Sequence, residues 1–352
     1  MTPPAKPKPA IKPRPAAQSA KLVFADNGLA LQLFGSHHKN LARLEQEMDV
    51  SIDARGNEVT ISGEADAVDG ACRVLEGLYS RLENGKNVNP EVVDAVLRMA
   101  NAPGGDIGDA ELTIRTKKRH ISPRSSVQAD YLRAIDRSEL VFGEGPAGTG
   151  KTYLAVAKGV ERLVMGSVDR IILSRPALEA GERLGFLPGD LREKVDPYLR
   201  PLYDALFDML PSPQVAKRLE KGEIEVAPLA FMRGRTFANA FVILDEAQNT
   251  TAVQMKMFLT RLGKNSSMVI TGDLSQVDLP HGVRSGLRDA METLSGVEGV
   301  DFVTFSDADV VRHPLVGRIV RAYDKEEGKS RTGARYEKKQ NPKDKTEPPA
   351  DG

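Results

Sequence analysis

The chain has 352 residues with 49 basic and 49 acidic side chains, so any contact with nucleic acid has to come from a local basic patch. A single cysteine, Cys72, excludes an intramolecular disulfide and a zinc site built from several cysteines. The sequence contains neither the run of roughly 18 apolar residues that a membrane-spanning helix needs nor an apolar signal-peptide core, which predicts a cytoplasmic protein without membrane contacts.

Residues 1–20 are rich in proline and basic residues, and this composition predicts a disordered or polyproline-like tail because it offers little apolar surface to bury. Residues 21–85 predict a small α+β module. Its expected strands are residues 22–24, 29–34, 50–53 and 59–61, and its expected helices are residues 38–48 and 68–82. Asp26-Asn27-Gly28 is expected to form the turn between the first two strands.

Residues 86–125 predict one helix followed by a basic linker. Asn89 suits the N-cap of this helix and Pro90 its first position, and the helix is expected to end before Pro103. The linker carries a group of basic side chains, which are Arg115, Lys117, Lys118, Arg119 and Arg124.

Residues 126–323 contain short apolar runs that alternate with helical patterns. The runs lie at residues 140–142, 171–173, 224–226, 241–244, 268–270 and 302–305. Apolar strands separated by helices indicate a doubly wound α/β fold, with a mostly parallel sheet covered on both faces. Ligands of such sheets bind at the carboxyl ends of the strands, so a site is expected there. Residues 324–352 are charged and poor in apolar side chains, which predicts a second disordered tail.

A phosphate-binding loop follows the first of these strands. The pattern G-x-x-x-x-G-K-[ST] is matched at every fixed position by Gly145, Pro146, Ala147, Gly148, Thr149, Gly150, Lys151 and Thr152. The glycines let backbone N–H groups turn towards phosphate, and the helix expected after the loop adds the positive end of its dipole. Lys151 supplies a charge for the β- and γ-phosphates, and the Thr152 hydroxyl is expected to coordinate Mg²⁺. The loop therefore predicts binding of ATP, or a close relative, with Mg²⁺.

Two carboxylates follow the apolar run at 241–244. Asp245 is expected to hold Mg²⁺ directly or through water, and Glu246 is expected to orient and deprotonate the attacking water. An adjacent Asp-Glu pair at this place favours hydrolysis over transfer to a bound acceptor.

The segment after the run at 268–270 is a candidate sensor of nucleotide state. Gln276 or Asp273 could form a hydrogen bond with the γ-phosphate or the attacking water. The alternative is an ordinary turn, because Gly-Asp is common turn chemistry.

Single polar residues near the ends of other elements are also candidates. The amide of Gln128, which precedes the phosphate-binding loop, can pair with an adenine edge, and the alternative is a surface glutamine. Arg312 is a candidate arginine finger, acting in its own chain or in a neighbouring subunit, and the alternative is a salt-bridged surface side chain. Arg318 and Arg321 are rivals for that role, and Arg175 is a candidate for contact with phosphate or nucleic acid.

Four segments together resemble the PhoH-like proteins over about residues 120–323. They are the phosphate-binding loop at 145–152, Leu-Asp-Glu-Ala-Gln-Asn at 244–249, Thr-Gly-Asp-Leu-Ser-Gln at 271–276 and Val-Arg-His-Pro-Leu-Val at 311–316. That family is similar to the first RecA-like domain of superfamily-one helicases and is described as phosphate-starvation-inducible, ATP-binding, cytoplasmic and linked to RNA metabolism. The likeness puts Gln128 where those helicases read adenine. The chain has no room for a second RecA-like domain, so a ring of subunits with Arg312 acting in trans would complete the nucleotide site.

The module at 21–85 resembles a KH-like RNA-binding domain in its first strand, helix, strand pair and closing helix. A KH domain grips nucleic acid with a G-x-x-G loop, and the equivalent place here, residues 35–40, has no second glycine. Lys39 and Arg43 could still contact phosphate. A module for oligomerisation or partner docking is the alternative.

The resulting hypothesis is an Mg²⁺-dependent ATPase that acts on RNA, as a helicase or remodeller, in a homo-oligomer. The alternative is a nucleotide-switched RNA-binding adaptor that recruits a ribonuclease or ribosomal partner and has little turnover. A small-molecule kinase is a third hypothesis, and Glu246 argues against it because this side chain suits the activation of water.

Overall fold

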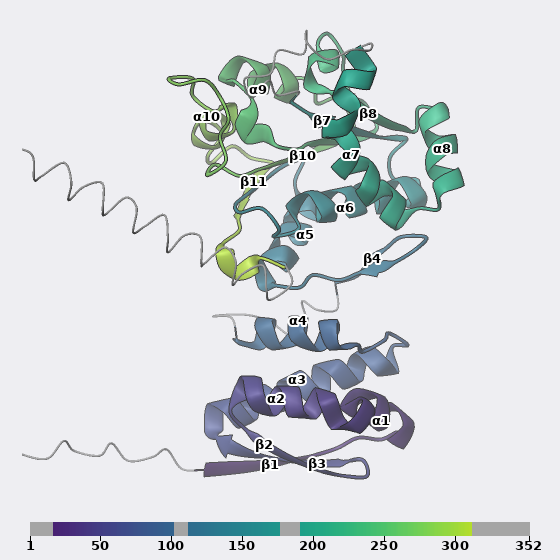
Figure 1. Ribbon diagram of the computed structural model, residues 1–352, viewed down its shortest axis with the longest axis vertical. Helices are drawn as coiled ribbons and strands as arrows, with labels where there is room; N and C mark the ends of the chain where they lie inside the picture. The colour runs from purple at the N-terminus through teal and green to yellow at the C-terminus, as the bar shows by residue number, and fades with distance from the viewer. Residues whose placement is uncertain (1–16, 102–111, 177–190, 312–352) are drawn as a thin grey trace, which may run out of the picture. The chain divides into compact units, whose positions relative to one another are not determined.

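The computed structural model describes residues 17–101, 112–176 and 191–311 (Figure 1). Most of the expected tail at 1–20, the whole tail at 324–352, and Arg312 with its two rivals lie outside the described residues. No helix among the described residues is both long enough and apolar enough to cross a membrane.

The N-terminal part forms a three-stranded antiparallel sheet with strand order β1-β3-β2. Its strands are β1 (Ala17–Val23), β2 (Ser51–Arg55) and β3 (Glu58–Glu64), and its helices are α1 (Asn27–Phe34), α2 (Lys39–Met48), α3 (Ala65–Glu83) and α4 (Pro90–Asn101). The helices pack over one face of the sheet (Figure 1). Residues 17–20, which were expected in the tail, belong to β1 and pair with β3.

The prediction of a strand at 29–34 is wrong, because these residues form helix α1. Asp26 was expected in a turn but is the N-cap, and its carboxylate accepts hydrogen bonds from the backbone N–H groups of Gly28 at 2.6 Å and Leu29 at 3.0 Å. The side chains buried by the helix are Ala30, Leu33 and Phe34, at helical spacing. The cap and this spacing outweigh the apolar run that suggested a strand.

The expected boundary between module and linker also differs from the structure. Helix α4 packs into the core of the N-terminal part through Val93, Val96 and Met99. Residues 112–125, expected as linker, contain a hairpin of β4 (Ile114–Arg115) and β5 (His120–Ile121). Its two isoleucines are buried in the same hydrophobic cluster as side chains of α6 and α7. The hairpin therefore packs with the C-terminal α/β part of the chain.

The second sheet has six strands, all parallel, in the order β11-β6-β10-β9-β7-β8, and it confirms the six strands expected after residue 126. The strands are β6 (Leu140–Glu144), β7 (Arg170–Arg175), β8 (Ile224–Pro228), β9 (Ala240–Leu244), β10 (Ser267–Gly272) and β11 (Val300–Thr304). The helices are α5 (Ser126–Arg137), α6 (Lys151–Met165), α7 (Leu191–Met209), α8 (Ser212–Glu220), α9 (Ala252–Leu259) and α10 (Gly286–Thr293).

Helices cover both faces of this sheet, so its central strands are apolar on both sides. In β9, Phe241 and Ile243 contribute to the cluster under α5, α6 and α7, while Val242 and Leu244 contribute to the cluster under α9 and α10. This two-sided burial explains why the strands appear in the sequence as unbroken apolar runs. The parallel pairing of β10 with β6 and β9 aligns the carboxyl ends of these strands at one edge, where the polar motifs follow.

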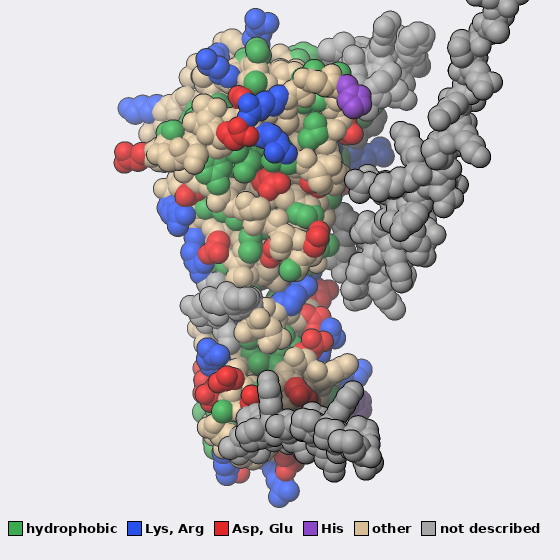
Figure 2. All heavy atoms as spheres, turned by 90° about the vertical axis from the view of Figure 1, so that its left-hand side faces the viewer, with side chains coloured by type: hydrophobic (Ala, Val, Ile, Leu, Met, Phe, Trp, Pro, Cys, Tyr) green, Lys and Arg blue, Asp and Glu red, His purple; other side chains and the backbone are tan. Residues whose placement is uncertain are grey.

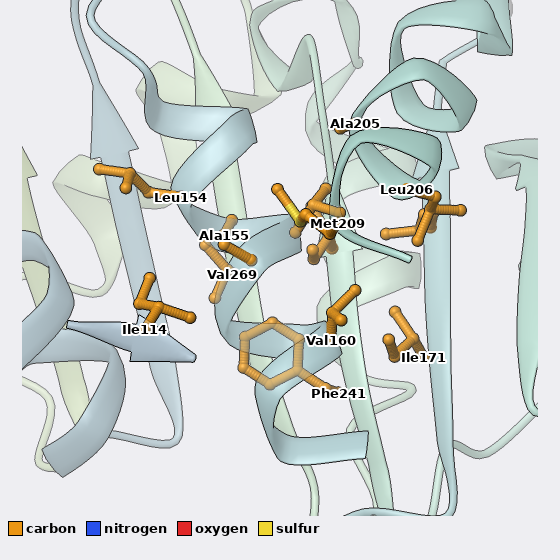
Figure 3. Close-up of a cluster of buried hydrophobic side chains, with 14 of the residues drawn as sticks. Ile114, Leu154, Ala155, Val160, Ile171, Ala205, Leu206, Met209, Phe241 and Val269 are labelled. Atoms are coloured by element: carbon orange, nitrogen blue, oxygen red, sulfur yellow. The ribbon is translucent and has the colours of Figure 1, made fainter. Parts of the chain in front are cut away.

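Figure 3 shows Phe241 among Val160, Ile171 and Val269 in the larger of these clusters. Because the ring is fully buried, Phe241→Ala is expected to lower the free energy of unfolding by about 3–5 kcal/mol. Denaturant unfolding of the purified variant measures this loss. Val253→Ala is the control, because Val253 is 79% exposed and its replacement is expected to change stability by less than about 0.5 kcal/mol. Equal stability of the two variants would contradict the buried position of the ring.

Candidate nucleotide-binding site

The phosphate-binding loop connects the end of β6 to the start of α6. Three of its residues have positive φ, Gly145 at 139°, Gly148 at 86° and Gly150 at 84°, which glycine adopts without steric cost. A Cβ atom on Gly145 would lie 2.4 Å from the carbonyl oxygen of Phe305, so a side chain does not fit there. The loop is also bonded to β10, the strand beside β6 in the sheet, because the Gly145 N–H donates to the Gly272 carbonyl at 3.1 Å. The curled backbone leads directly into a helix N-terminus, which is the geometry that binds phosphate.

Lys151 is the first residue of α6 and is buried inside the loop. Its ammonium group donates to the carbonyl oxygens of Gly145 at 2.5 Å and Pro146 at 2.7 Å, and to the Thr149 hydroxyl at 3.2 Å. Burial lowers the pKa of Lys151, although nearby carboxylates, led by Asp273, oppose this shift. The loop therefore surrounds one cation whose burial disfavours its charge, and a phosphate group would stabilise that charge.

The oxygen atoms expected to hold a metal ion lie together next to this loop. The Thr152 hydroxyl donates to Asp245 Oδ1 at 2.6 Å, and the Thr271 hydroxyl donates to the same oxygen at 2.8 Å. Asp245 is buried, and these three residues come from α6, β10 and the end of β9. Hydroxyl and carboxylate oxygens suit Mg²⁺, which usually keeps water and phosphate oxygens as its other ligands. The described residues contain no group of three or more His, Cys, Asp or Glu side chains that could hold a metal.

Glu246 follows Asp245 in a left-handed backbone conformation with φ 52° and ψ 38°. Its side chain is 35% exposed, and both carboxylate oxygens have a partner. Oε1 pairs with Arg175 Nη2 at 2.9 Å, and Oε2 accepts a hydrogen bond from Gln248 Nε2 at 2.5 Å. The carboxylate is therefore held in place and remains partly open to water.

The segment after β10 is joined to Glu246 through Gln248. Asp273 Oδ2 accepts from the amide of Gln276 at 2.7 Å, and the Asp273 N–H donates to the Gln248 side chain at 3.0 Å. Gln248 also donates to the Gln276 carbonyl at 3.2 Å. The candidate sensor therefore lies next to the candidate base, while its contact with phosphate stays a prediction.

Gln128 is not a surface side chain, because it is 3% exposed and lies against the phosphate-binding loop. Its amide nitrogen donates to the Thr149 carbonyl at 2.8 Å, and its oxygen accepts from the Arg124 N–H at 2.7 Å. These bonds attach the start of α5 to the loop. Contact with adenine stays a prediction.

Three residues were missing from the predicted site. Thr271 and Gln248 touch Asp245 and Glu246 respectively. Arg175 was considered only for contact with phosphate or nucleic acid, but it pairs with Glu246. One signal could have found Arg175, because it ends a strand whose neighbours in a parallel sheet end at the same edge.

A parallel sheet with this loop at its carboxyl edge defines the class of P-loop nucleotide-binding proteins. The chain belongs to the family of PhoH-like proteins, whose family model matches residues 120–324. This membership confirms the family suggested by the sequence.

Relatives of known name agree with this membership. A PhoH-like protein of Bacillus subtilis (strain 168) is 50% identical over 314 residues, which cover 88% of this chain and 98% of the relative. A PhoH-like protein of Mycobacterium tuberculosis (strain ATCC 25618 / H37Rv) is 51% identical over 310 residues, 87% of this chain and 88% of the relative. Protein PhoH of Escherichia coli (strain K12) is 53% identical over 205 residues, 58% of each chain.

Proposed function

We propose that this protein is an Mg²⁺-dependent ATPase of the cytoplasm that acts on RNA. The observation that supports hydrolysis is the position of Glu246, a partly exposed carboxylate that directly follows the buried Asp245. Asp245 in turn accepts a hydrogen bond from Thr152, at the end of the phosphate-binding loop. When bound, Mg²⁺ supplies charge neutralisation on the phosphate oxygens. Lys151 binds the β- and γ-phosphates, and Glu246 orients the attacking water and accepts its proton.

Phosphate release from ATP by the purified chain tests this proposal, with and without Mg²⁺ and with single- and double-stranded RNA. We expect release that depends on Mg²⁺ and increases with RNA. The alternative is an adaptor that binds nucleotide and RNA and recruits a ribonuclease or ribosomal partner. Nucleotide binding without phosphate release would support the adaptor, and transfer of phosphate to an added acceptor would support a kinase.

The N-terminal part supports a contact with RNA through its order of elements. A strand, two helices, a strand pair and a further helix follow each other, whereas the KH-like resemblance predicted a single helix between the first strand and the strand pair. The turn between α1 and α2 lies at Gly35 to His38, the place expected for the G-x-x-G loop. Arg43 pairs with Asp94, whereas Lys39 is exposed. Docking of a protein partner stays the alternative for this part.

The β4–β5 hairpin offers a second surface for a polyanion. Arg115, Lys117, Lys118, Arg119 and His120 are all exposed, and no acidic residue lies between them. On the face shown in Figure 2, basic and acidic side chains are interspersed, and the chain as a whole has no net charge. The hairpin differs from this pattern because its charged side chains are all basic. We propose that RNA phosphates bind here.

The hairpin is closed and anchored by hydrogen bonds and an ion pair, and such preorganisation lowers the entropic cost of binding. The Thr116 N–H and hydroxyl both donate to the Arg119 carbonyl, at 3.0 and 2.8 Å, and close the turn. Arg119 pairs with Asp208 at 2.6 Å, and Lys118 donates to the Phe207 carbonyl at 2.6 Å, which anchors the turn to the end of α7.

Removing the hairpin cations that have no partner is expected to weaken RNA binding in a salt-dependent way. The side chains of Arg115 and Lys117 make no hydrogen bond or ion pair with other described residues. In Arg115→Ala/Lys117→Ala, the slope of log affinity against log salt should fall by about 0.7 for each lost phosphate contact. Fluorescence anisotropy with a single-stranded RNA at several salt concentrations measures this slope.

The matched control is Lys256→Ala/Lys264→Ala, which removes the same charge from exposed positions of the same domain. An equal fall in slope for both double variants would show that the hairpin is not a specific surface. An unchanged slope for the hairpin variant would place RNA elsewhere, and binding of an acidic protein to the hairpin would favour a docking role.

We also propose a homo-oligomer, with a ring as its simplest closed form. The support is the likeness to a RecA-like domain, because a neighbouring subunit can supply one side of the nucleotide site of such a domain. Arg312 acts in trans in this proposal. Light scattering of the purified chain with and without ATP tests it.

A further inference from the structure

We propose that Arg175 is a positioning residue that holds Glu246 and ties it to helix α7. This inference rests on the proposed ATP hydrolysis, because Glu246 is the base in that reaction. Arg175 ends β7, the strand next to β9, and Ser174 is in register with Leu244. The guanidinium group therefore reaches the carboxyl end of the neighbouring strand, where the carboxylates lie.

The guanidinium group joins three separate parts of the fold. Its Nη2 pairs with Glu246 Oε1 at 2.9 Å, its Nε lies 3.9 Å from Asp245 Oδ2, and its Nη1 donates to the Tyr198 carbonyl in α7 at 2.8 Å. The side chain is 21% exposed, so these contacts are partly shielded from solvent. A planar fork of donors can make such contacts in different directions at once, which the single ammonium group of lysine does less well.

Glu246 depends on such contacts because its backbone alone does not determine where the carboxylate points. A non-glycine residue in the left-handed region is sterically disfavoured and persists only where the surroundings hold it. Gln248 holds one carboxylate oxygen and Arg175 holds the other. Without Arg175, the carboxylate keeps one partner and can turn away from the line of attack on the γ-phosphate.

The test compares the kinetics of full-length variants. Arg175→Ala is expected to lower kcat by about 10- to 100-fold, the effect of a small misplacement of a reacting group, with the Kd for MgATP changed by less than about 2-fold. Arg175→Lys should recover part of kcat. Arg175→Ala should lower kcat no further in a Glu246→Gln background, because its effect acts through that carboxylate.

Arg218→Ala is the matched control. Arg218 pairs with Glu223 at 2.6 Å with side-chain exposures of 21% and 33%, close to the 21% and 35% of Arg175 and Glu246. This control is expected to keep kcat, and its thermal unfolding reports the general cost of losing such a pair. An unchanged or raised kcat in Arg175→Ala would overturn the proposal, and so would a further loss in the Glu246→Gln background.

A second measurement does not depend on turnover. Hydrogen exchange of the peptide that covers residues 244–250 is expected to be faster in Arg175→Ala than in wild type or Arg218→Ala. If the wild-type chain released no phosphate, the proposed function would fail, and faster exchange would still support the contact. Exchange equal to that of wild type would overturn the holding role of Arg175 even in an active enzyme.

Discussion

Lys151→Ala is expected to weaken the binding of MgATP strongly. The ammonium group lies at the centre of the loop, and hydrogen bonds between ionised groups contribute about 1.5–3 kcal/mol each. Loss of two such bonds to phosphate lowers affinity by about 100-fold or more. Isothermal titration calorimetry with MgATP measures the loss.

The folded state is expected to survive this substitution. Burial lowers the pKa of Lys151, so its charged form is disfavoured in the loop, and removing the charge offsets part of the loss of its hydrogen bonds to Gly145 and Pro146. Lys256→Ala, at an exposed position in α9, is the control and should bind MgATP as wild type does. Undiminished heat of binding in Lys151→Ala would overturn the assignment of the loop.

Glu246→Gln is expected to keep MgATP binding and to lower kcat by about 10²–10⁴-fold, the usual contribution of a general base. The substitution keeps the shape of the side chain and removes its ability to accept a proton from water. Phosphate release under single-turnover conditions, together with calorimetry on the same sample, separates chemistry from binding. The ion pair of Glu246 with Arg175 that the substitution removes is partly exposed, so its loss should affect folding little.

The control for Glu246→Gln is Glu298→Gln, which changes an exposed glutamate in a loop far along the chain. Wild-type turnover is expected for this control. Unchanged turnover in Glu246→Gln would remove Glu246 from its role and leave nucleotide binding intact. Binding of MgATP by the wild type without any turnover would support the adaptor.

The strand predictions succeeded where the strands are buried on both faces of the sheet. The runs at 241–244 and 268–270 are buried on both faces and are apolar without interruption, so their nature is visible locally. The error at 29–34 has the opposite cause. A short apolar run is compatible with either a strand or a helix, and the hydrogen bonds that the Asp26 carboxylate accepts from the backbone favour the helix.

The site also combines a motif that is visible in the local sequence with contacts between residues that are far apart in the sequence. The loop at 145–152 was recognisable because its glycines serve a local backbone shape. The bond between Thr152 and Asp245 joins residues 93 positions apart, and the pairing of Arg175 with Glu246 depends on β7 lying next to β9. Neither contact has a local pattern.

Sequence by itself determined that this chain folds a parallel sheet around a phosphate-binding loop and carries the carboxylates of a nucleotide site, because loop shape and burial leave local patterns. Tertiary structure alone decided that β10 lies between the strands of the loop and of Asp245, and that Arg175 and Gln248 hold Glu246. The physical reason is that strand order depends on the free energy of packing the whole sheet, and a hydrogen bond between residues distant in the sequence requires that order.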